Sequence, residues 1–181
     1  MIKKSMQELE RMSPQAFHAI KKMPLIVILE NVRSMHNVGS VFRTADAFRT
    51  EMILLCGYTP QPPHRDIQKT ALGATETVAW KAYPEAAEAI AFAKEKGYRI
   101  LAVEQTHTSV DLRSYAASKD EQLALVFGNE AVGIEQHTLA LCDGAIEIPQ
   151  FGTKHSFNIS VSVGIVLWEL FNKIKMHEES E

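Results

Sequence analysis

The sequence lacks the short motifs that mark the commonest cofactor-dependent and metal-dependent enzymes. No GxGxxG follows a predicted strand, so the fingerprint of dinucleotide-binding folds and Rossmann-type methyltransferases is missing. The P-loop pattern GxxxxGK[ST] and the nucleophile pattern GxSxG are missing as well. The seven histidines are scattered, without the spacing of HExxH or another ligand set. These absences argue against an ordinary hydrolase or zinc enzyme, and we predict no metal site.

Cysteine is scarce, and no apolar run is long enough for a membrane span. The two cysteines, Cys56 and Cys142, stand alone in or beside apolar strand-like segments, which predicts reduced core residues rather than a disulfide. The N-terminus has no apolar signal-peptide core. The longest apolar run, near the C-terminus, is interrupted by Ser160, Ser162 and Gly164 and is too short to cross a bilayer. We therefore expect a cytoplasmic protein without a membrane partner.

The chain also carries little net charge. The net charge of -3 argues against a protein that coats nucleic acid by bulk electrostatics. Three acidic residues lie in the terminal "MHEESE", however, so a local basic face remains compatible with the composition. The length of 181 residues and the hydrophobic content of 46% are typical of one globular domain.

Apolar strand-like segments alternate with helical ones along the chain. Strands are predicted at 24–31, 51–57, 76–83, 98–105, 123–130 and 144–149. Helices are predicted after Ser5 and Ser13, within 31–48, at 84–96 and 135–141, and after Asn158. The Pro-rich stretch 58–70 is expected to be a surface loop. Since several strands are apolar on both faces, the fold class is α/β, with a mostly parallel sheet covered by helices on both faces.

A first polar cluster follows the strand at 24–31. It contains Asn31, Arg33, Asn37 and Arg43. Ligands of parallel α/β proteins bind at the carboxyl ends of the strands, and an arginine there suits a phosphate because its fork binds two oxygens at once. The alternative is a helix that is capped by Asn37 and carries an exposed arginine.

A second cluster is "FGNEAVGI" at 127–134. Gly128 and Gly133 allow the backbone to approach a ligand closely, and Glu130 stands at the tip of the strand. The alternative is a tight strand-to-helix turn with an exposed glutamate.

A third cluster precedes the apolar C-terminal segment and contains Lys154, His155, Ser156 and Asn158. Ser156 and Asn158 are good N-terminal capping residues, which is compatible with function because a capped helix start also directs N–H groups at a ligand. Lys154 and His155 are expected to be loop residues.

Together the three clusters resemble motifs 1, 2 and 3 of the TrmH-type (SpoU) RNA methyltransferases of the SPOUT superfamily. The matching stretches are "NVRSMHNVGSVFRTADAF", "LVFGNEAVGI" and "IEIPQFGTKHSFNISVSVGIVLWEL", which stand in order, each after a strand. The resemblance covers roughly 25–170. It divides the chain into a short helical extension at 1–24, a SPOUT methyltransferase domain at 25–175, and a frayed acidic tail at 176–181.

The resemblance implies a sheet whose C-terminal segment threads a deep trefoil knot, a rare exception among folds. It also implies a homodimer with the active site at the subunit interface and S-adenosyl-L-methionine bound, bent, in the knot. The implied reaction is methylation of a ribose 2′-hydroxyl in tRNA or rRNA.

The residues implied for the site follow motif by motif. The catalytic group comprises Asn37 and Arg43 from motif 1, Glu130 from motif 2, and Ser156 and Asn158 from motif 3. The adenosyl part of the cofactor is expected at Gly128, Ile148 and Phe157, largely through their backbone. Two positions depart from the family, since Phe157 stands where leucine is usual and Ser162 where alanine is common.

Cationic residues near these motifs are candidates for contacts with RNA phosphates. They are Arg33, Arg49, Arg65, Lys69 and Lys154. The alternative for each is a solvated surface charge, and we expect no separate N-terminal RNA-binding domain. Three other functions remain open: a catalytically silent RNA-binding protein of this fold, a methyltransferase that acts on a base, and a small-molecule methyltransferase. The Asn37 and Arg43 pair favours ribose.

Overall fold

The fold is a seven-stranded parallel sheet with helices on both faces, seen in a computed structural model that describes residues 1–5, 8, 12–118 and 121–178. The strands are β1 (Met23–Glu30), β2 (Thr50–Cys56), β3 (Ala79–Tyr83), β4 (Arg99–Val103), β5 (Val110–Asp111), β6 (Leu123–Phe127) and β7 (Gly144–Glu147). The helices are α1 (Pro14–Ala19), α2 (Met35–Ala47), α3 (Arg65–Ala71), α4 (Ala74–Thr77), α5 (Ala86–Glu95), α6 (Gln136–Leu139) and α7 (Ile159–Glu178).

The strands lie in the order β3-β2-β1-β6-β4-β7-β5, and every pair is parallel. β1 and β6 lie at the centre, in register from Leu25 opposite Leu123 to Leu29 opposite Phe127. Both strands are buried on both faces, which is why their sequences are continuous apolar runs instead of alternating ones. The predicted fold class is confirmed, and the sheet is entirely parallel.

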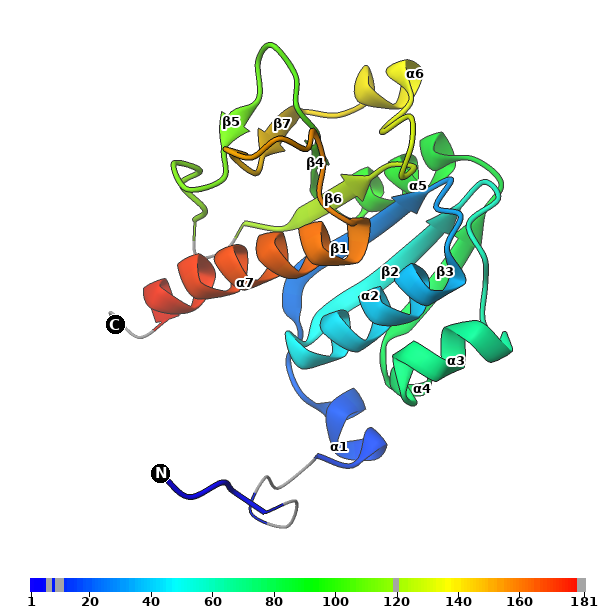
Figure 1. Ribbon diagram of the computed structural model, residues 1–181, viewed down its shortest axis with the longest axis vertical. Coiled ribbons are helices and arrows are strands. Elements are labelled where there is room, and N and C mark those ends of the chain that lie inside the picture. The colour runs from blue at the N-terminus through cyan, green and yellow to red at the C-terminus, as the bar shows by residue number, and fades with distance from the viewer. Residues whose placement is uncertain (6–7, 9–11, 119–120, 179–181) are drawn as a thin grey trace.

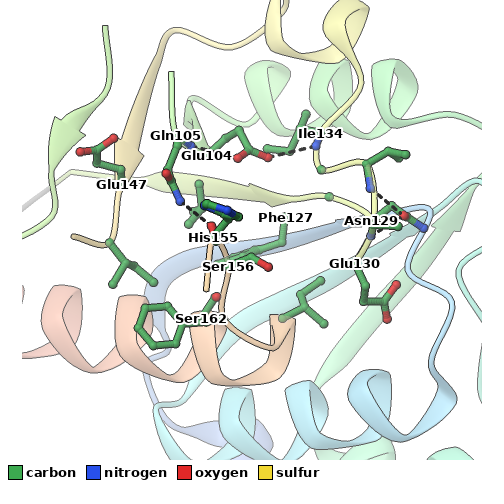
Figure 2. A pocket seen from close by; sticks show the side chains of 18 of the residues that line it. Glu104, Gln105, Phe127, Asn129, Glu130, Ile134, Glu147, His155, Ser156 and Ser162 are labelled. Carbon is green, nitrogen blue, oxygen red and sulfur yellow. Dashed lines mark hydrogen bonds between the residues drawn. The ribbon is translucent and has the colours of Figure 1, made fainter. Parts of the chain in front are cut away.

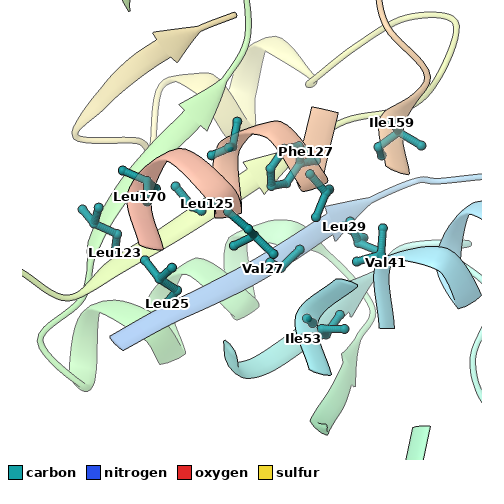
Figure 3. Close-up of a cluster of buried hydrophobic side chains, with 14 of the residues drawn as sticks. Leu25, Val27, Leu29, Val41, Ile53, Leu123, Leu125, Phe127, Ile159 and Leu170 are labelled. Atoms are coloured by element: carbon teal, nitrogen blue, oxygen red, sulfur yellow. The ribbon is translucent and has the colours of Figure 1, made fainter. Parts of the chain in front are cut away.

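Two hydrophobic layers hold the helices against the sheet. On one face, α2 and α7 lie side by side over β1 and β6, while α5 covers the other face (Figure 1). Leu25, Val27 and Leu29 of β1 pack with Leu170 of α7 and Val41 of α2 in the first layer (Figure 3). Burying each of these side chains stabilises the fold by roughly 1.5–3 kcal/mol. The buried residues of α2 are Val38, Gly39, Val41, Phe42 and Ala45.

The sequence-based expectation was wrong for part of the Pro-rich stretch. Its second half forms α3, where His64 caps the helix by accepting a hydrogen bond from the Asp66 amide through its Nδ1 atom, at 3.2 Å. The short helix α4 occupies the start of the segment predicted as the strand 76–83, and the two-residue strand β5 was not predicted. Gly39 explains why α3 lies so close to α2: a Cβ atom there would lie 2.2 Å from the Ile67 carbonyl oxygen.

Several local signals were confirmed. Ser13 caps the predicted helix α1 by accepting from the Ala16 amide at 3.2 Å, and this helix ends at Ala19. Gly97 lies just beyond the end of α5 with a φ of 87°, a conformation common after helix ends. The Ser5 amide donates to Glu8 Oε2 at 2.6 Å and the Glu8 amide donates to Ser5 Oγ at 3.4 Å, which together form a capping box. The helix expected after Ser5 falls largely outside the described residues.

The structure also shows the state of the two cysteines and bears on the predicted absence of a membrane span. Cys56 is buried and Cys142 half-buried, and both are free thiols. Burial raises the pKa of Cys56 to about 12 and that of Cys142 to about 11, so both are protonated at neutral pH. Within the part of the chain that the structure describes, no helix has the length and hydropathy of a bilayer span.

Candidate functional site: a cavity at the carboxyl ends of three strands

A cavity of about 490 Å³ lies at the carboxyl ends of β4, β6 and β7, next to the start of α7 (Figure 2). Parallel strands bring these ends to one edge of the sheet, where open α/β sheets bind their ligands. The volume falls within the range of small-molecule sites. The lining residues that matter below are Glu104, Gln105, Gly128, Glu130, Gly133, Ile134, Glu147, Ile148, His155, Ser156, Phe157 and Ser162.

The turn after β6 forms one wall of the cavity. The Asn129 amide donates to the Gly133 carbonyl at 3.0 Å, and the Gly133 amide donates back at 2.9 Å. The Asn129 side chain accepts from the Ala131 amide at 2.8 Å, which tightens the turn. A Cβ atom on Gly128 would lie 2.2–2.3 Å from backbone atoms of Gly133 and Ile134. Position 128 therefore has room for glycine alone.

A chain of hydrogen bonds joins the three predicted motifs beside this wall. Asn37 Nδ2 donates to Glu130 Oε1 at 3.0 Å, and Asn158 Nδ2 donates to Asn37 Oδ1 at 3.1 Å. Glu130 also accepts from the Arg33 and Ser34 amides, at 3.0 and 3.2 Å. The residues of this chain come from α2, the β6 turn and the start of α7. The structure thus brings together Asn37, Glu130 and Asn158.

The Glu130 carboxylate is held in its charged form. Partial burial by itself raises the pKa of Glu130, but hydrogen bonds from the Arg33 amide, its own amide, Asn37 and the Ser34 amide outweigh burial. The pKa of Glu130 therefore lies below its ordinary value of 4.5. The charged carboxylate accepts all of these bonds, so it orients Asn37, and through Asn37 the start of α7.

Two capping assignments change. Ser34, not Asn37, caps α2, because its hydroxyl accepts from the Asn37 amide at 3.2 Å. Asn158 caps α7: its Oδ1 accepts from the Ser160 amide at 2.9 Å, and its carbonyl accepts from the Ser162 amide at 2.9 Å. With Ser34 in the capping role, the Asn37 side chain is available to Glu130 and Asn158. Ser156 lies outside the helix.

The residues expected to hold the cofactor all line the cavity. Gly128 lies on the β6 wall and Ile148 follows β7, while Phe157 comes from the loop before α7. Ser156 from the catalytic group lies on the same loop and also lines the cavity. Phe157 keeps 42% of its side chain exposed, so it borders an open mouth. Ser162, the second departure from the family, also lines the cavity.

Arg43 is the predicted catalytic residue that neither lines the cavity nor joins the hydrogen-bonded chain of Asn37, Glu130 and Asn158. It lies on the exposed side of α2, six residues after Asn37, and is not among the lining residues. Six residues along a helix rotate a side chain by about 240°, so Asn37 and Arg43 point in different directions. The helical repeat therefore explains why Asn37 joins the hydrogen-bonded chain and Arg43 does not, although both lie on α2.

The five predicted cations are spread over the surface. Arg33 and Lys154 are exposed near the site, on the loop before α2 and the loop before α7. Arg65 and Lys69 lie on α3, where Lys69 pairs with Asp66 at 2.6 Å. Arg49 precedes β2 and therefore lies at the amino edge of the sheet, opposite the cavity. The structure thus does not gather Arg49 with the site.

Sequence reasoning missed several side chains of the cavity, above all Glu104 and Gln105. Glu104 Oε2 accepts from the Ile134 amide at 3.2 Å, and Gln105 Nε2 donates to the His155 carbonyl at 3.0 Å (Figure 2). Both follow β4 directly. Since the sequence predicts this strand, its carboxyl end was a signal that could have identified them.

The arrangement suits a small organic ligand more than a metal. Among the described residues, no group of three or more His, Cys, Asp or Glu side chains is placed to hold a metal ion. The cavity instead offers a glycine cradle at Gly128, apolar contacts from Ile148 and Phe157, and several hydrogen-bonding groups. Such a mixture of apolar walls with a few polar groups is typical of cofactor sites.

Known proteins resemble this chain over most of its length. The model of the SpoU rRNA Methylase family matches residues 24–168. The tRNA (guanosine(18)-2'-O)-methyltransferase of Thermus thermophilus is 33% identical over 145 residues, which cover 80% of this chain and 73% of that enzyme. Among solved structures, the TrmH/SpoU tRNA modifying enzyme of A. aeolicus has a TM-score of 0.79 at 24% identity and covers 91% of this chain and 82% of its own.

A second solved structure, the AdoMet bound rRNA methyltransferase from Sinorhizobium meliloti, is 26% identical with a TM-score of 0.76. It covers 90% of this chain, which in turn spans 61% of that one. The family model matches residues 24–168, well over half of the chain. The chain therefore belongs to the SpoU rRNA methylase family.

Proposed function

We propose that this protein is an S-adenosyl-L-methionine-dependent RNA methyltransferase that acts on a ribose 2′-hydroxyl of tRNA or rRNA. The observation that carries the proposal is the hydrogen-bonded chain Glu130–Asn37–Asn158, which joins three motifs distant in sequence beside one cavity. The relative from Thermus thermophilus is named for ribose methylation of tRNA, and the Sinorhizobium meliloti protein is named an rRNA methyltransferase.

The cavity fits the cofactor. Its volume of about 490 Å³ is sufficient for a nucleoside with an amino-acid tail. Because Gly128 has no side chain, the main chain at this position can approach the adenosyl group closely. We assign Gly128, Ile148 and Phe157 to this group. When bound, the cofactor supplies the methyl group that is transferred.

The chain's own residues then position the acceptor. Asn37, Ser156 and Asn158 hold the ribose and its surroundings by hydrogen bonds, and Glu130 fixes Asn37. Arg43 binds the phosphate next to the target ribose and stabilises the negative charge that develops on the 2′-oxygen. A guanidinium is a poor base, so the hydroxyl proton passes to the phosphate or to water.

Binding and product mapping test the proposal. Isothermal titration calorimetry with S-adenosyl-L-methionine is expected to give saturable binding at one site per chain. Mass-spectrometric mapping of tRNA and rRNA, from cells with and without the gene, is expected to show one ribose methylation that depends on it. Absence of cofactor binding would favour the silent RNA-binding alternative, and a methyl group on a base would favour the base-methylating one.

We further propose that the protein is a homodimer and that the active site is completed across the interface. Two observations support this. Arg43 is exposed, and it neither lines the cavity of its own chain nor joins the chain of Asn37, Glu130 and Asn158. α7 presents an exposed apolar face with Val161 48% and Trp168 55% exposed, seven residues apart and therefore on one side of the helix. Gly164 lies on another side, facing Thr44 of α2 in the same chain.

Mixing two inactive variants tests the shared site. Arg43→Ala removes the arginine, and Gly128→Ala blocks the cavity of the other chain. If Arg43 serves the partner's cavity, mixed dimers contain one intact site, and the mixture recovers about a quarter of wild-type activity. If Arg43 serves its own cavity, the mixture remains inactive, because every site then carries one defect. Each variant alone, measured at the same total concentration, is the control.

The remaining features implied by the family complete the proposal. We propose that the C-terminal segment threads a trefoil knot, supported by α7, which follows β7 in the chain yet packs over β1 and β6 at the centre of the sheet (Figures 1 and 3). An experimental structure with an unthreaded C-terminal segment would contradict it. The proposed division at 25 and 175 follows from the same resemblance, and the cytoplasmic location is proposed from the two isolated cysteines. Limited proteolysis and cell fractionation test these two proposals.

RNA is proposed to lie over the α2 and α7 ends, where Arg33 and Lys154 flank the site. We assign Arg65, the first residue of α3, to the RNA-binding group as well, whereas Lys69 is already paired with Asp66 and Arg49 lies at the opposite edge. Phosphate contacts of this kind position RNA without reading its sequence. Affinity should therefore depend on Arg33, Arg65 and Lys154 more than on Lys69 or Arg49, as filter binding of the five alanine variants would measure.

A further inference from the structure

Glu104 belongs to none of the three motifs, yet it forms part of the cavity wall. It follows β4 and lies between the β6 turn and the loop before α7 (Figure 2). Its Oε2 accepts from the Ile134 amide at 3.2 Å, and its Oε1 accepts from the Gln105 amide at 3.0 Å. Both oxygens of the Glu104 carboxylate thus accept backbone N–H bonds, which fix its orientation in the wall.

The turn after β6 packs closely against the Glu104 carboxylate. A Cβ atom on Gly133 would lie 2.4 Å from Glu104 Oε2, and the φ of 73° at Gly133 favours glycine as well. On the other side, Gln105 Nε2 donates to the His155 carbonyl at 3.0 Å. The dipeptide 104–105 thus touches both loops that enclose the cavity, which fixes the negative charge of Glu104 in the wall.

The cavity as a whole is electronegative. Three carboxylates line it, those of Glu104, Glu130 and Glu147, and none of its lining residues within the described ranges is lysine or arginine. Glu130 is committed to Asn37 and two backbone amides, and Glu147 Oε2 accepts from Ser109 Oγ at 2.7 Å. A site with this composition attracts a cation more strongly than a neutral molecule of the same shape.

We propose that Glu104 is a specificity-determining residue that makes the cavity prefer a cationic sulfonium ligand to the corresponding neutral thioether. This inference rests on the proposed function, in which the sulfonium compound is S-adenosyl-L-methionine and the thioether is the product S-adenosyl-L-homocysteine. The two molecules have nearly the same shape and differ by one positive charge. Shape contacts in the cavity therefore cannot separate them well, whereas a fixed carboxylate can.

The consequence is a cavity that binds the methyl donor and releases the spent product. Once the methyl group has left, the ligand no longer carries the sulfonium charge, and its attraction to Glu104 is lost. Coulomb attraction between unit charges about 4 Å apart is worth about 5-fold in affinity at the dielectric of water and more at an intermediate one. The preference for the sulfonium ligand over the thioether therefore comes from Glu104, which lines the cavity, and not from the motif residues around the ribose.

Calorimetric titration of both ligands tests the inference in the full-length protein. Glu104→Gln keeps an oxygen that accepts from the Ile134 amide and removes the charge. The dissociation constant of S-adenosyl-L-methionine is expected to rise about 10-fold in this variant, and that of S-adenosyl-L-homocysteine by less than about 2-fold. Equal weakening of both ligands would show a merely structural role, and no change in either would show no role; both results overturn the inference.

Two further measurements keep the test decisive. Glu88→Gln, on the exposed side of α5, removes one carboxylate outside the cavity and should leave the ratio of the two dissociation constants unchanged. In the wild-type protein, raising the salt concentration should weaken S-adenosyl-L-methionine more than S-adenosyl-L-homocysteine, since screening acts on the charged ligand. An equal salt effect on both contradicts the inference even if Glu104→Gln does not fold. Failure of the wild type to bind either ligand would instead overturn the proposed function itself.

Discussion

Gly128→Ala is expected to abolish cofactor binding and to destabilise the fold. The added Cβ atom would lie 2.2–2.3 Å from the backbone of Gly133 and Ile134, where no flexible side chain can move away. The turn after β6 must open, which separates the paired amides of Asn129 and Gly133. We expect a loss of about 1–3 kcal/mol in stability from overpacking. Affinity for S-adenosyl-L-methionine should fall at least about 100-fold, near 2.7 kcal/mol.

Gly152→Ala is the matched control for this prediction. Gly152 lies in the loop between β7 and α7, and a Cβ atom there would meet nothing within 4 Å. Its alanine variant should bind the cofactor and unfold like the wild type. Calorimetry and thermal unfolding measure both quantities. Wild-type affinity in Gly128→Ala would mean that the β6 turn does not contact the cofactor.

The sheet could be predicted because its central strands are buried on both faces. In a chain that alternates strands with helices, continuous apolar runs such as 25–29 and 123–127 are typical of strands covered by helices on both sides. α3 was missed because its capping residue is histidine and because prolines precede it, a composition more typical of a loop. β5, with two residues, pairs only with β7 among the described strands and has no periodicity to detect.

The site was predictable where polar residues follow strands and resemble the family motifs. That reasoning found Asn37, Glu130 and Asn158, and the structure joins them by hydrogen bonds. It did not find Glu104, because the "EQ" after β4 belongs to no motif and falls within the predicted strand 98–105. The hydrogen bond between Glu104 and Ile134, 30 residues apart, depends on strand order, which local patterns do not determine.

The direction of Arg43 shows another limit of sequence reasoning. Spacing placed Asn37 and Arg43 on one helix near one ligand, and the residue types were those expected for a phosphate and a ribose. The helix, however, turns the two side chains apart, so only Asn37 joins the network of its own chain. The sequence can predict that an arginine takes part in the reaction. It does not determine whether that arginine serves the cavity of its own chain or the cavity of a partner chain.

Arg43→Lys is expected to lose turnover while it retains cofactor affinity. Lysine keeps the positive charge but lacks the planar fork that holds two oxygens, so it cannot fix both the phosphate and the developing 2′-oxyanion. We expect turnover to fall about 100-fold or more, comparable to the removal of one donor from an oxyanion site. Since Arg43 does not line the cavity, the dissociation constant of S-adenosyl-L-methionine should stay within about 2-fold of wild type.

The comparison of turnover with binding separates this role from a structural one. Arg43 is exposed and makes no hydrogen bond or ion pair with any residue that the structure describes, so its replacement should leave thermal unfolding unchanged. Arg99→Lys, in a surface pair with Glu121 at 3.2 Å, controls for the substitution itself. Single-turnover methylation of the target RNA measures the chemical step, and near-normal turnover in Arg43→Lys would rule out bidentate binding. A turnover defect with unchanged stability and cofactor affinity would assign the guanidinium to the phosphate and 2′-oxygen of the acceptor and not to the fold.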